Sequence, residues 1–210
     1  MSYHHGDLRR ALLAAARQLV AERGVENFTL RQVARLAGVS HAAPYHHFAD
    51  KAALVAALAE ESFVELADAL RAPLGDAVGE PLERLQAMGL AYVHFAVSHP
   101  AEFRFMFRPE LRNSAEQTPG ADPAEAQAVE RAGLAAYQVL VDGIVACQEA
   151  GLVPPGDPGP LALTAWSTVH GLAMLLVDGP LQRDAAAAGY RDRVAREVTE
   201  RLAQGLLVRR

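Results

Sequence analysis

The chain has 210 residues, of which 51% are hydrophobic and only 6% aromatic, and its formal net charge is −5. This length is enough for one domain with a substantial buried core, or for a small head and a larger body. A single cysteine, Cys147, excludes an internal disulfide and a thiolate zinc cluster and fits a reducing cytoplasm.

The first predicted helix follows a short polar arm and ends at Gly24, with Asp7 as its expected N-cap. Its apolar residues recur on one face at helical spacing: Leu8, Leu12, Ala15, Ala16 and Leu19. Alanine and leucine dominate the apolar residues of the whole chain, which favours packed helices over sheets. His4 and His5 lie in the arm without a third ligand nearby, so we expect no metal site there.

Two short helices joined by a glycine turn are predicted next. Thr29 caps the first of them, and Gly38 ends it. Ser40 is the expected cap of the second, which we predict to span Ser40 to Phe48. This organisation is a helix-turn-helix, whose second helix enters a DNA major groove.

Pro44 conflicts with a regular helix at this position. Its nitrogen cannot donate to the Ser40 carbonyl, and its ring biases Ala43 away from helical angles. Either the second helix begins later than Ser40 or its first turn is distorted, and the sequence leaves both interpretations open.

Three features of this region occur together: Ala37-Gly38-Val39-Ser40 at the turn, Tyr45-x-x-Phe48 at the end of the second helix, and Lys51 followed by Leu54. In these features the chain resembles the TetR family of bacterial transcription regulators. The resemblance implies a helix-turn-helix head, which we place at residues 1–52, and an effector-binding and dimerisation body at residues 53–210. Many relatives have lysine, glycine, threonine and leucine at positions 41–44, so this chain departs from them there.

The N-terminal residues of the second helix are the ones that reach base edges in this motif, and here they are His41, Ala42 and Ala43. The whole expected DNA-contacting set is Arg31, Gln32, Ser40, His41, Ala42, Ala43, Tyr45, His46 and Lys51. For Arg31 and Gln32, a solvated helix face is the equal alternative. Residues 1–60 carry seven basic and five acidic side chains, whereas the remainder carries 13 and 20, so the positive charge lies in the head.

The body is predicted to be helical throughout. A connecting helix leads from Asp50 to about Pro73, and further helices are expected at residues 81–98, 101–107, 123–150, 160–177 and 189–208. Residues 109–122 form a polar, proline-bearing loop. The predicted fold is therefore all-α with about nine helices. The last helix has an apolar residue at every fourth position: Tyr190, Val194, Val198, Leu202 and Leu206.

Trp166, His170 and Gly171 form a Trp-x-x-x-His-Gly pattern, and the chain opens with Tyr3-His4-His5-Gly6. Both features resemble the WHG class of TetR C-terminal regions. The resemblance implies a homodimer through the last two helices and an effector pocket in the body, with no cofactor. The expected ligand-binding set is Phe63, Tyr92, Phe95, Phe103, Phe107, Tyr137, Trp166, His170 and Met174. A tryptophan and a hydrogen-bonded histidine of the core are the alternative for Trp166 and His170.

An enzyme is not expected, because the sequence has no phosphate-binding glycine loop, no His-Glu-x-x-His helix and no nucleophile elbow. The apolar run Leu161 to Val177 is shorter than a membrane span needs and contains polar residues, so we expect no membrane association and a cytoplasmic protein. We predict a repressor that a small apolar or aromatic effector releases from a pseudo-palindromic operator. The alternative is a helical small-molecule sensor or adaptor that no longer binds DNA.

Overall fold

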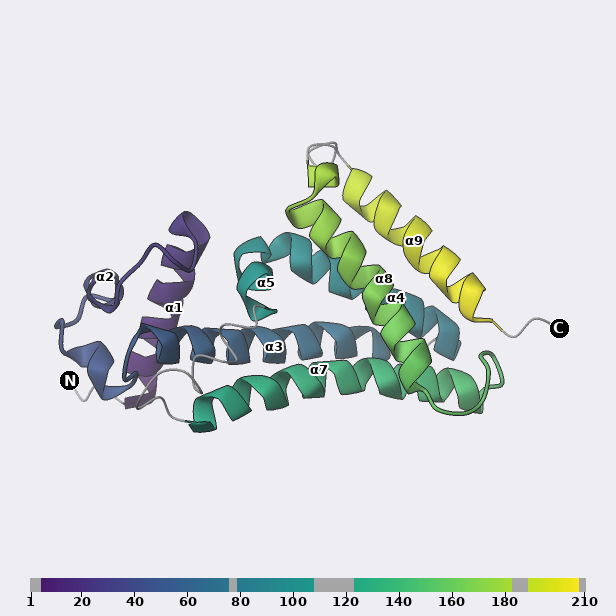
Figure 1. Cartoon of the computed structure of the whole chain (residues 1–210), viewed down its shortest axis with the longest axis horizontal. Helices are drawn as coiled ribbons and strands as arrows, with labels where there is room; N and C mark the ends of the chain where they lie inside the picture. The colour runs from purple at the N-terminus through teal and green to yellow at the C-terminus, as the bar shows by residue number, and fades with distance from the viewer. Residues whose placement is uncertain (1–4, 76–78, 108–122, 183–188, 208–210) are drawn as a thin grey trace. The chain divides into compact units, whose positions relative to one another are not determined.

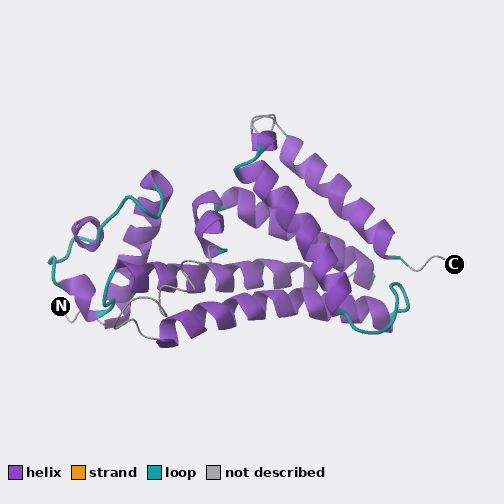
Figure 2. Cartoon of the chain, viewed as in Figure 1, coloured by secondary structure: helices purple, strands orange, loops and turns teal. Residues whose placement is uncertain are grey.

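The structure is a computed structural model, and it describes residues 5–75, 79–107, 123–182 and 189–207. Within these ranges the chain folds into eight α-helices and two short 3-10 helices, without a β-strand (Figures 1 and 2). The all-helical prediction is confirmed. One of the nine expected helices, the second of the helix-turn-helix, is a 3-10 helix instead. The predicted polar loop at residues 109–122 lies outside the described residues, as do Tyr3 and His4.

The chain divides by its contacts into two compact units. The first unit comprises Met1–Phe63 and Pro100–Gly133, and the second comprises Val64–His99 and Leu134–Arg210. Two long helices, α3 (Lys51–Gly75) and α7 (Pro123–Glu149), contribute one end to each unit. The boundary between residues 52 and 53, which the resemblance implies, stays a prediction.

In the first unit, α1 (His5–Arg23) packs against α2 (Leu30–Leu36) and against α5 (Pro100–Met106). Helix α1 begins before Asp7, so the expectation that Asp7 caps it is wrong. Gly24 follows the helix with φ +80°, a left-handed conformation that favours glycine and ends the helix as expected. The buried residues of this unit are mainly aliphatic and include Leu12, Leu13, Val33 and Leu54.

In the second unit, α4 (Pro81–Ser98), α8 (Gly159–Val177) and α9 (Tyr190–Leu206) pack against one another, and a short 3-10 helix, η2 (Pro180–Gln182), packs on α8. Cys147 is fully buried in a cluster with Leu85, Ile144 and Ala162 and is thus a small core residue. By length and composition alone α8 could cross a membrane, but the packed core helices of globular proteins pass the same test.

The buried face of α9 differs from the predicted one. Its buried residues are Ala195, Thr199, Ala203 and Leu206, whereas the row of larger residues from Tyr190 to Leu202 is only half-buried. The reason is close approach, because a Cβ on Gly89 of α4 would lie 2.9 Å from Thr199 Cγ2. Small side chains therefore face α4, and the larger apolar row lies at the edge of this contact.

Candidate functional site

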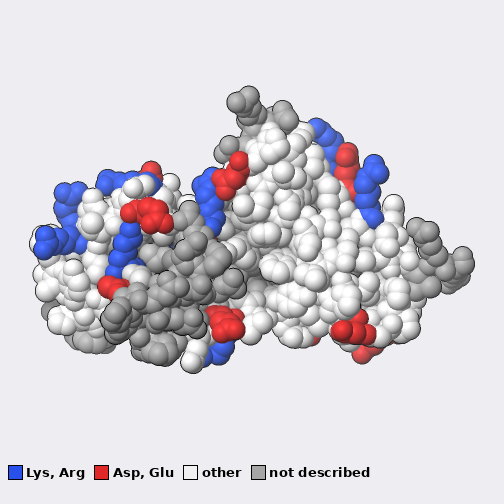
Figure 3. Space-filling model, viewed as in Figure 1, with Lys and Arg blue, Asp and Glu red and all other residues white. Residues whose placement is uncertain are grey.

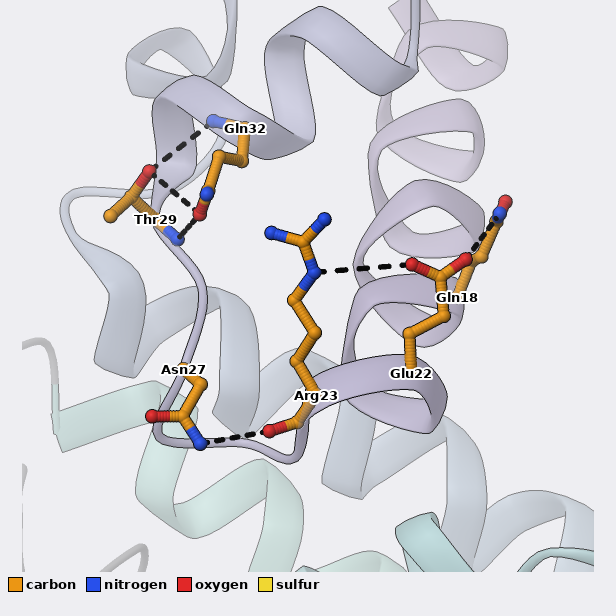
Figure 4. A network of polar contacts seen from close by, with 6 residues as sticks. All are labelled: Gln18, Glu22, Arg23, Asn27, Thr29 and Gln32. Atoms are coloured by element: carbon orange, nitrogen blue, oxygen red, sulfur yellow. Dashed lines mark hydrogen bonds and ion pairs between the residues drawn. The ribbon is translucent and has the colours of Figure 1, made fainter.

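The first helix of the helix-turn-helix has the cap that the sequence predicts. Thr29 Oγ1 accepts the N–H of Gln32 at 3.3 Å, and Gln32 Oε1 accepts the N–H of Thr29 at 2.8 Å, forming a reciprocal capping box (Figure 4). The Asn27 amide donates to the Arg23 carbonyl at 2.8 Å and so ties the preceding loop to the end of α1. The side-chain oxygen of Gln32 is used in the cap, so Gln32 would contact DNA as a donor, through its side-chain NH₂ group.

The second helix of the motif is η1 (Ala43–His46), a 3-10 helix. The predicted α-helix from Ser40 to Phe48, capped by Ser40, is wrong, because the N-cap is Ala42 and it makes no side-chain hydrogen bond. The Ser40 carbonyl accepts from Ala43 N–H at 3.0 Å, a bond to the third residue that avoids the missing donor of Pro44. The structure therefore decides between the two interpretations of Pro44: the helix begins later.

Within this motif, burial separates the residues that hold the head together from those that face solvent. Leu30, Val33, Ala34, Pro44 and Phe48 are buried. Of the expected DNA-contacting set, Ala43, Gln32 and Lys51 are half-buried, and the others are exposed: Arg31, Ser40, His41, Ala42, Tyr45 and His46. Tyr45, at 54% exposure, is one of the most exposed large hydrophobic side chains among the described residues.

Lys51 has contacts within the head that the sequence did not reveal. Its Nζ donates to the Glu26 carbonyl at 2.9 Å and lies 4.6 Å from the centre of the Phe28 ring. An ammonium has three N–H donors, so this bond leaves others for a phosphate. Asp50 accepts the N–H of Ala53 at 2.9 Å and caps α3, which fixes Lys51 as its first residue.

Basic side chains gather over α1 and α2 on the face drawn in Figure 3, with acidic ones among them. Arg10, Arg23, Arg31 and Arg35 are all exposed on these two helices. The surface around the helix-turn-helix is therefore suited to attract a polyanion although the whole chain is acidic.

The expected ligand-binding residues are divided between the two units. In the second unit, the Tyr92 hydroxyl lies 2.8 Å from His170 Nδ1, and Trp166 Nε1 donates to the same hydroxyl at 3.3 Å. The Tyr137 and Trp166 rings meet edge to face with centroids 5.7 Å apart. We call Tyr92, Tyr137, Trp166 and His170 the aromatic cluster. Trp166 and His170, the pair of the WHG-type pattern, thus both contact the Tyr92 hydroxyl on α4. Tyr92 lies too far from them along the chain for the sequence to indicate this contact.

The electrostatics of the cluster follow from burial. Desolvation raises the pKa of Tyr92 far above its ordinary value, and the Trp166 N–H only partly offsets this. Desolvation also lowers the pKa of His170, so the imidazole is held neutral. A neutral ring has one N–H donor and one acceptor nitrogen, so in one tautomer Nδ1 accepts the Tyr92 O–H and in the other Nδ1–H donates to the Tyr92 oxygen. The cluster is therefore an uncharged hydrogen-bonding surface with aromatic walls.

The other expected ligand-binding residues lie elsewhere. In the first unit, the Phe107 ring contacts both Phe63 and Phe103, with centroids 5.4 and 5.2 Å away. Phe95 stacks on His99 at 4.7 Å. Met174 is 37% exposed on α8, on the same side as exposed Leu175 and Gly171.

The chain matches two family descriptions. Residues 12–58 match "Bacterial regulatory proteins, tetR family", and residues 85–201, more than half of the chain, match "Tetracyclin repressor-like, C-terminal domain". Among curated proteins, it is 33% identical over 109 residues to the HTH-type transcriptional repressor KstR2 of Mycobacterium tuberculosis, over 52% of this chain and 54% of that protein. It is 40% identical over 60 residues to the repressor AcnR of Corynebacterium efficiens, over 29% of this chain and 32% of that one. The chain thus spans about half the length, or less, of these curated relatives.

Solved structures agree over nearly the whole chain. A protein of unknown function from Rhodococcus sp. RHA1 is 36% identical, with a TM-score of 0.79 over 99% of this chain and 100% of that one. The TetR family regulator PfmR of Thermus thermophilus is 21% identical, with a TM-score of 0.69 over 94% and 99%, which speaks for the fold alone. The family to which these matches point is one of regulators rather than of enzymes. The chain belongs to the TetR family of bacterial regulatory proteins.

Proposed function

We propose that this protein is a cytoplasmic, homodimeric repressor that binds operator DNA through its helix-turn-helix and is released by a small-molecule effector. The observation that carries the proposal is the division of residues in the motif. Six of the nine side chains expected to meet DNA are exposed and the other three are half-buried, while those that would hold a head together are buried. A motif kept only for structure has no reason to expose Tyr45, His41 and Arg31 on adjoining segments.

In the proposed complex each protomer presents η1 to one of two successive major grooves, about one helical turn apart on a pseudo-palindromic operator. His41 and Ala42 precede η1 and reach base edges, since an imidazole can donate or accept and a methyl group can meet the thymine methyl. Tyr45, His46, Arg31 and Lys51 bond phosphates and fix the register of the head.

The proposed dimer surface lies on α8 and α9. In one protomer, α8 exposes Leu163 at 53%, Met174 at 37% and Leu175 at 42%, and a Cβ on Gly171 would meet nothing within 4 Å. The half-buried row of α9, which includes Val194, Val198 and Leu202, borders its contact with α4. A second copy that packs on these residues would bury apolar surface that one protomer leaves in water. We therefore assign Met174 to the dimer surface rather than to the effector site.

The proposed effector site is the aromatic cluster. Its ring surfaces suit an apolar or aromatic molecule, and its hydroxyl and imidazole groups supply a few oriented polar contacts. An effector that binds more tightly to a dimer whose heads are wrongly spaced for the operator lowers the affinity for DNA by that same difference.

The test is binding of the purified protein to labelled duplex DNA from immediately upstream of its own gene, at two salt concentrations and against a scrambled duplex. Saturable, salt-sensitive binding that prefers the native duplex is expected. Aromatic and aliphatic compounds that release DNA from this complex would support the effector site if a Trp166→Ala variant still binds DNA but no longer releases it in response to them.

The short 3-10 form of η1 favours one alternative, a small-molecule sensor that has lost DNA binding. In that case no duplex binds even at low salt, although compounds still raise the melting temperature of the protein. Equal, weak binding to both duplexes would instead mean that the operator lies elsewhere.

A further inference from the structure

Helix α5 carries a buried carboxylate that faces α1. Glu102 is 7% exposed, and its Oε1 lies 4.0 Å from Nη1 of Arg17 on α1, within the first unit. Burying a carboxylate is costly, and one guanidinium at this distance compensates only in part. The apolar residues Phe103, Phe105 and Met106 are all nearly fully buried, and they anchor α5 in the core without a charge. Glu102 is thus the one charged side chain among the buried residues of α5.

The contact continues through further charged side chains to Phe48, which follows η1 in the chain. Arg17 Nη2 lies 3.6 Å from Glu61 Oε2 on α3, and Glu61 Oε1 lies 3.9 Å from Arg9 Nη1, two helical turns away on α1. The Arg9 guanidinium is 5.6 Å from the centre of the Phe48 ring. Phe48 donates its N–H to the Pro44 carbonyl at 2.9 Å. We call the series Glu102, Arg17, Glu61, Arg9 and Phe48 the charged path.

One end of the charged path is joined through the chain to the aromatic cluster. Tyr92 lies in α4, which ends at Ser98, and α5 begins at Pro100. The chain passes from the second unit to the first between His99 and Pro100. Only His99 therefore separates α4 from the helix that carries Glu102.

We propose that Glu102 is a positioning residue for DNA binding. By holding Arg17 it sets the orientation of α1, and through Glu61 and Arg9 it sets the position of Phe48 and η1. An effector that displaces α4 then weakens DNA binding by moving Glu102 away from Arg17. The inference rests on the proposed function, because operator affinity is its main readout.

The decisive substitution is Glu102→Gln, which keeps the shape of the side chain and removes its charge. By long-range electrostatics alone, the loss of a negative charge would leave DNA affinity unchanged or raise it. A positioning role has the opposite sign, and we expect a dissociation constant about 5- to 30-fold higher, the range of couplings carried by such networks. Glu130→Gln is the matched control, because Glu130 is exposed on α7 in the same unit and loses the same charge.

The pathway is tested by a double-mutant cycle with Arg17→Gln. If Glu102 acts through Arg17, Glu102→Gln has little further effect in the Arg17→Gln background. Glu102→Asp, which keeps the charge on a shorter side chain, should recover part of the affinity. It also provides a reading if Glu102→Gln does not fold. Unchanged affinity in Glu102→Gln, or full additivity with Arg17→Gln, would overturn the proposal.

Failure of the proposed function is a separate result, in which the wild-type protein itself binds no duplex. Amide hydrogen exchange of the protein without DNA then tests the positioning role directly. Faster exchange at residues 43–48 in Glu102→Gln but not in Glu130→Gln supports the charged path, and equal exchange in the two variants refutes it.

Discussion

Lys51 is the residue for which the structure changes the expected outcome of a mutation most. From the sequence, its loss should affect only a phosphate contact. The structure adds a charge-assisted bond to the Glu26 carbonyl and a cation-π contact with Phe28. At a half-exposed site these contribute about 1.5–2 kcal/mol together. For a chain of this length that corresponds to a melting temperature lower by about 3–8 °C.

We therefore expect two effects from Lys51→Met, which removes the ammonium and keeps most of the apolar stem. The melting temperature falls by the amount above, and the slope of log K against log salt for operator binding decreases by about one unit. The assays are thermal unfolding by circular dichroism and fluorescence anisotropy with labelled duplex at several salt concentrations. Arg131→Met, an exposed charge loss on α7, is the control for net charge.

The two readouts separate the two roles of Lys51. A lower melting temperature with an unchanged salt slope would show that the ammonium serves only the head and that its assignment to phosphate is wrong. An unchanged melting temperature would refute the energetic reasoning from the Glu26 and Phe28 contacts. Altered base preference with an intact slope would contradict the phosphate assignment in a different way.

Three further substitutions test other parts of the structure. Tyr45→Phe should weaken binding to all duplexes about 3- to 10-fold without changing stability, because the hydroxyl is at the surface, and anisotropy on operator and scrambled DNA would reveal any unexpected change in base preference. Gly171→Leu should convert the dimer to monomer with its helical spectrum intact, because a Cβ at this position meets nothing within 4 Å in one protomer, and an unchanged mass in sedimentation would disprove the α8 surface. Burial lowers the folded-state pKa of His170, so its contribution to stability is present above about pH 6.5 and is lost as the pH falls below it, by at most about 1.4 kcal/mol per pH unit. Urea unfolding at pH 7.5 and 5.5 should show a smaller pH dependence in His170→Gln, and an equal dependence would count against a buried neutral imidazole.

Local signals predicted most of the helices because each signal acts within a few residues. Thr29 and Gln32 are three positions apart, so the capping box is legible in the sequence, and Pro81 and His99-Pro100 mark the two ends of α4. The prediction for the second helix of the motif was wrong because of Pro44, the residue that left its start open in the sequence. Pro44 has no N–H to donate, and the Ser40 carbonyl accepts from Ala43 instead, so that the helix begins later than Ser40.

The sequence by itself determined the family and the all-helical fold, because these depend on short-range spacing and caps. It predicted a single ligand-binding set made up mainly of aromatic residues of the body. Only the tertiary structure decided that Tyr92 bonds His170 across 78 positions of the chain, and that the Phe107 group belongs to another unit. Only the tertiary structure shows that Glu102 is buried against Arg17. It also shows that the buried face of α9 is offset by one residue from the row of larger apolar side chains. Such contacts depend on how closely particular helices approach, and this is set by packing across the whole core rather than by any neighbouring residues.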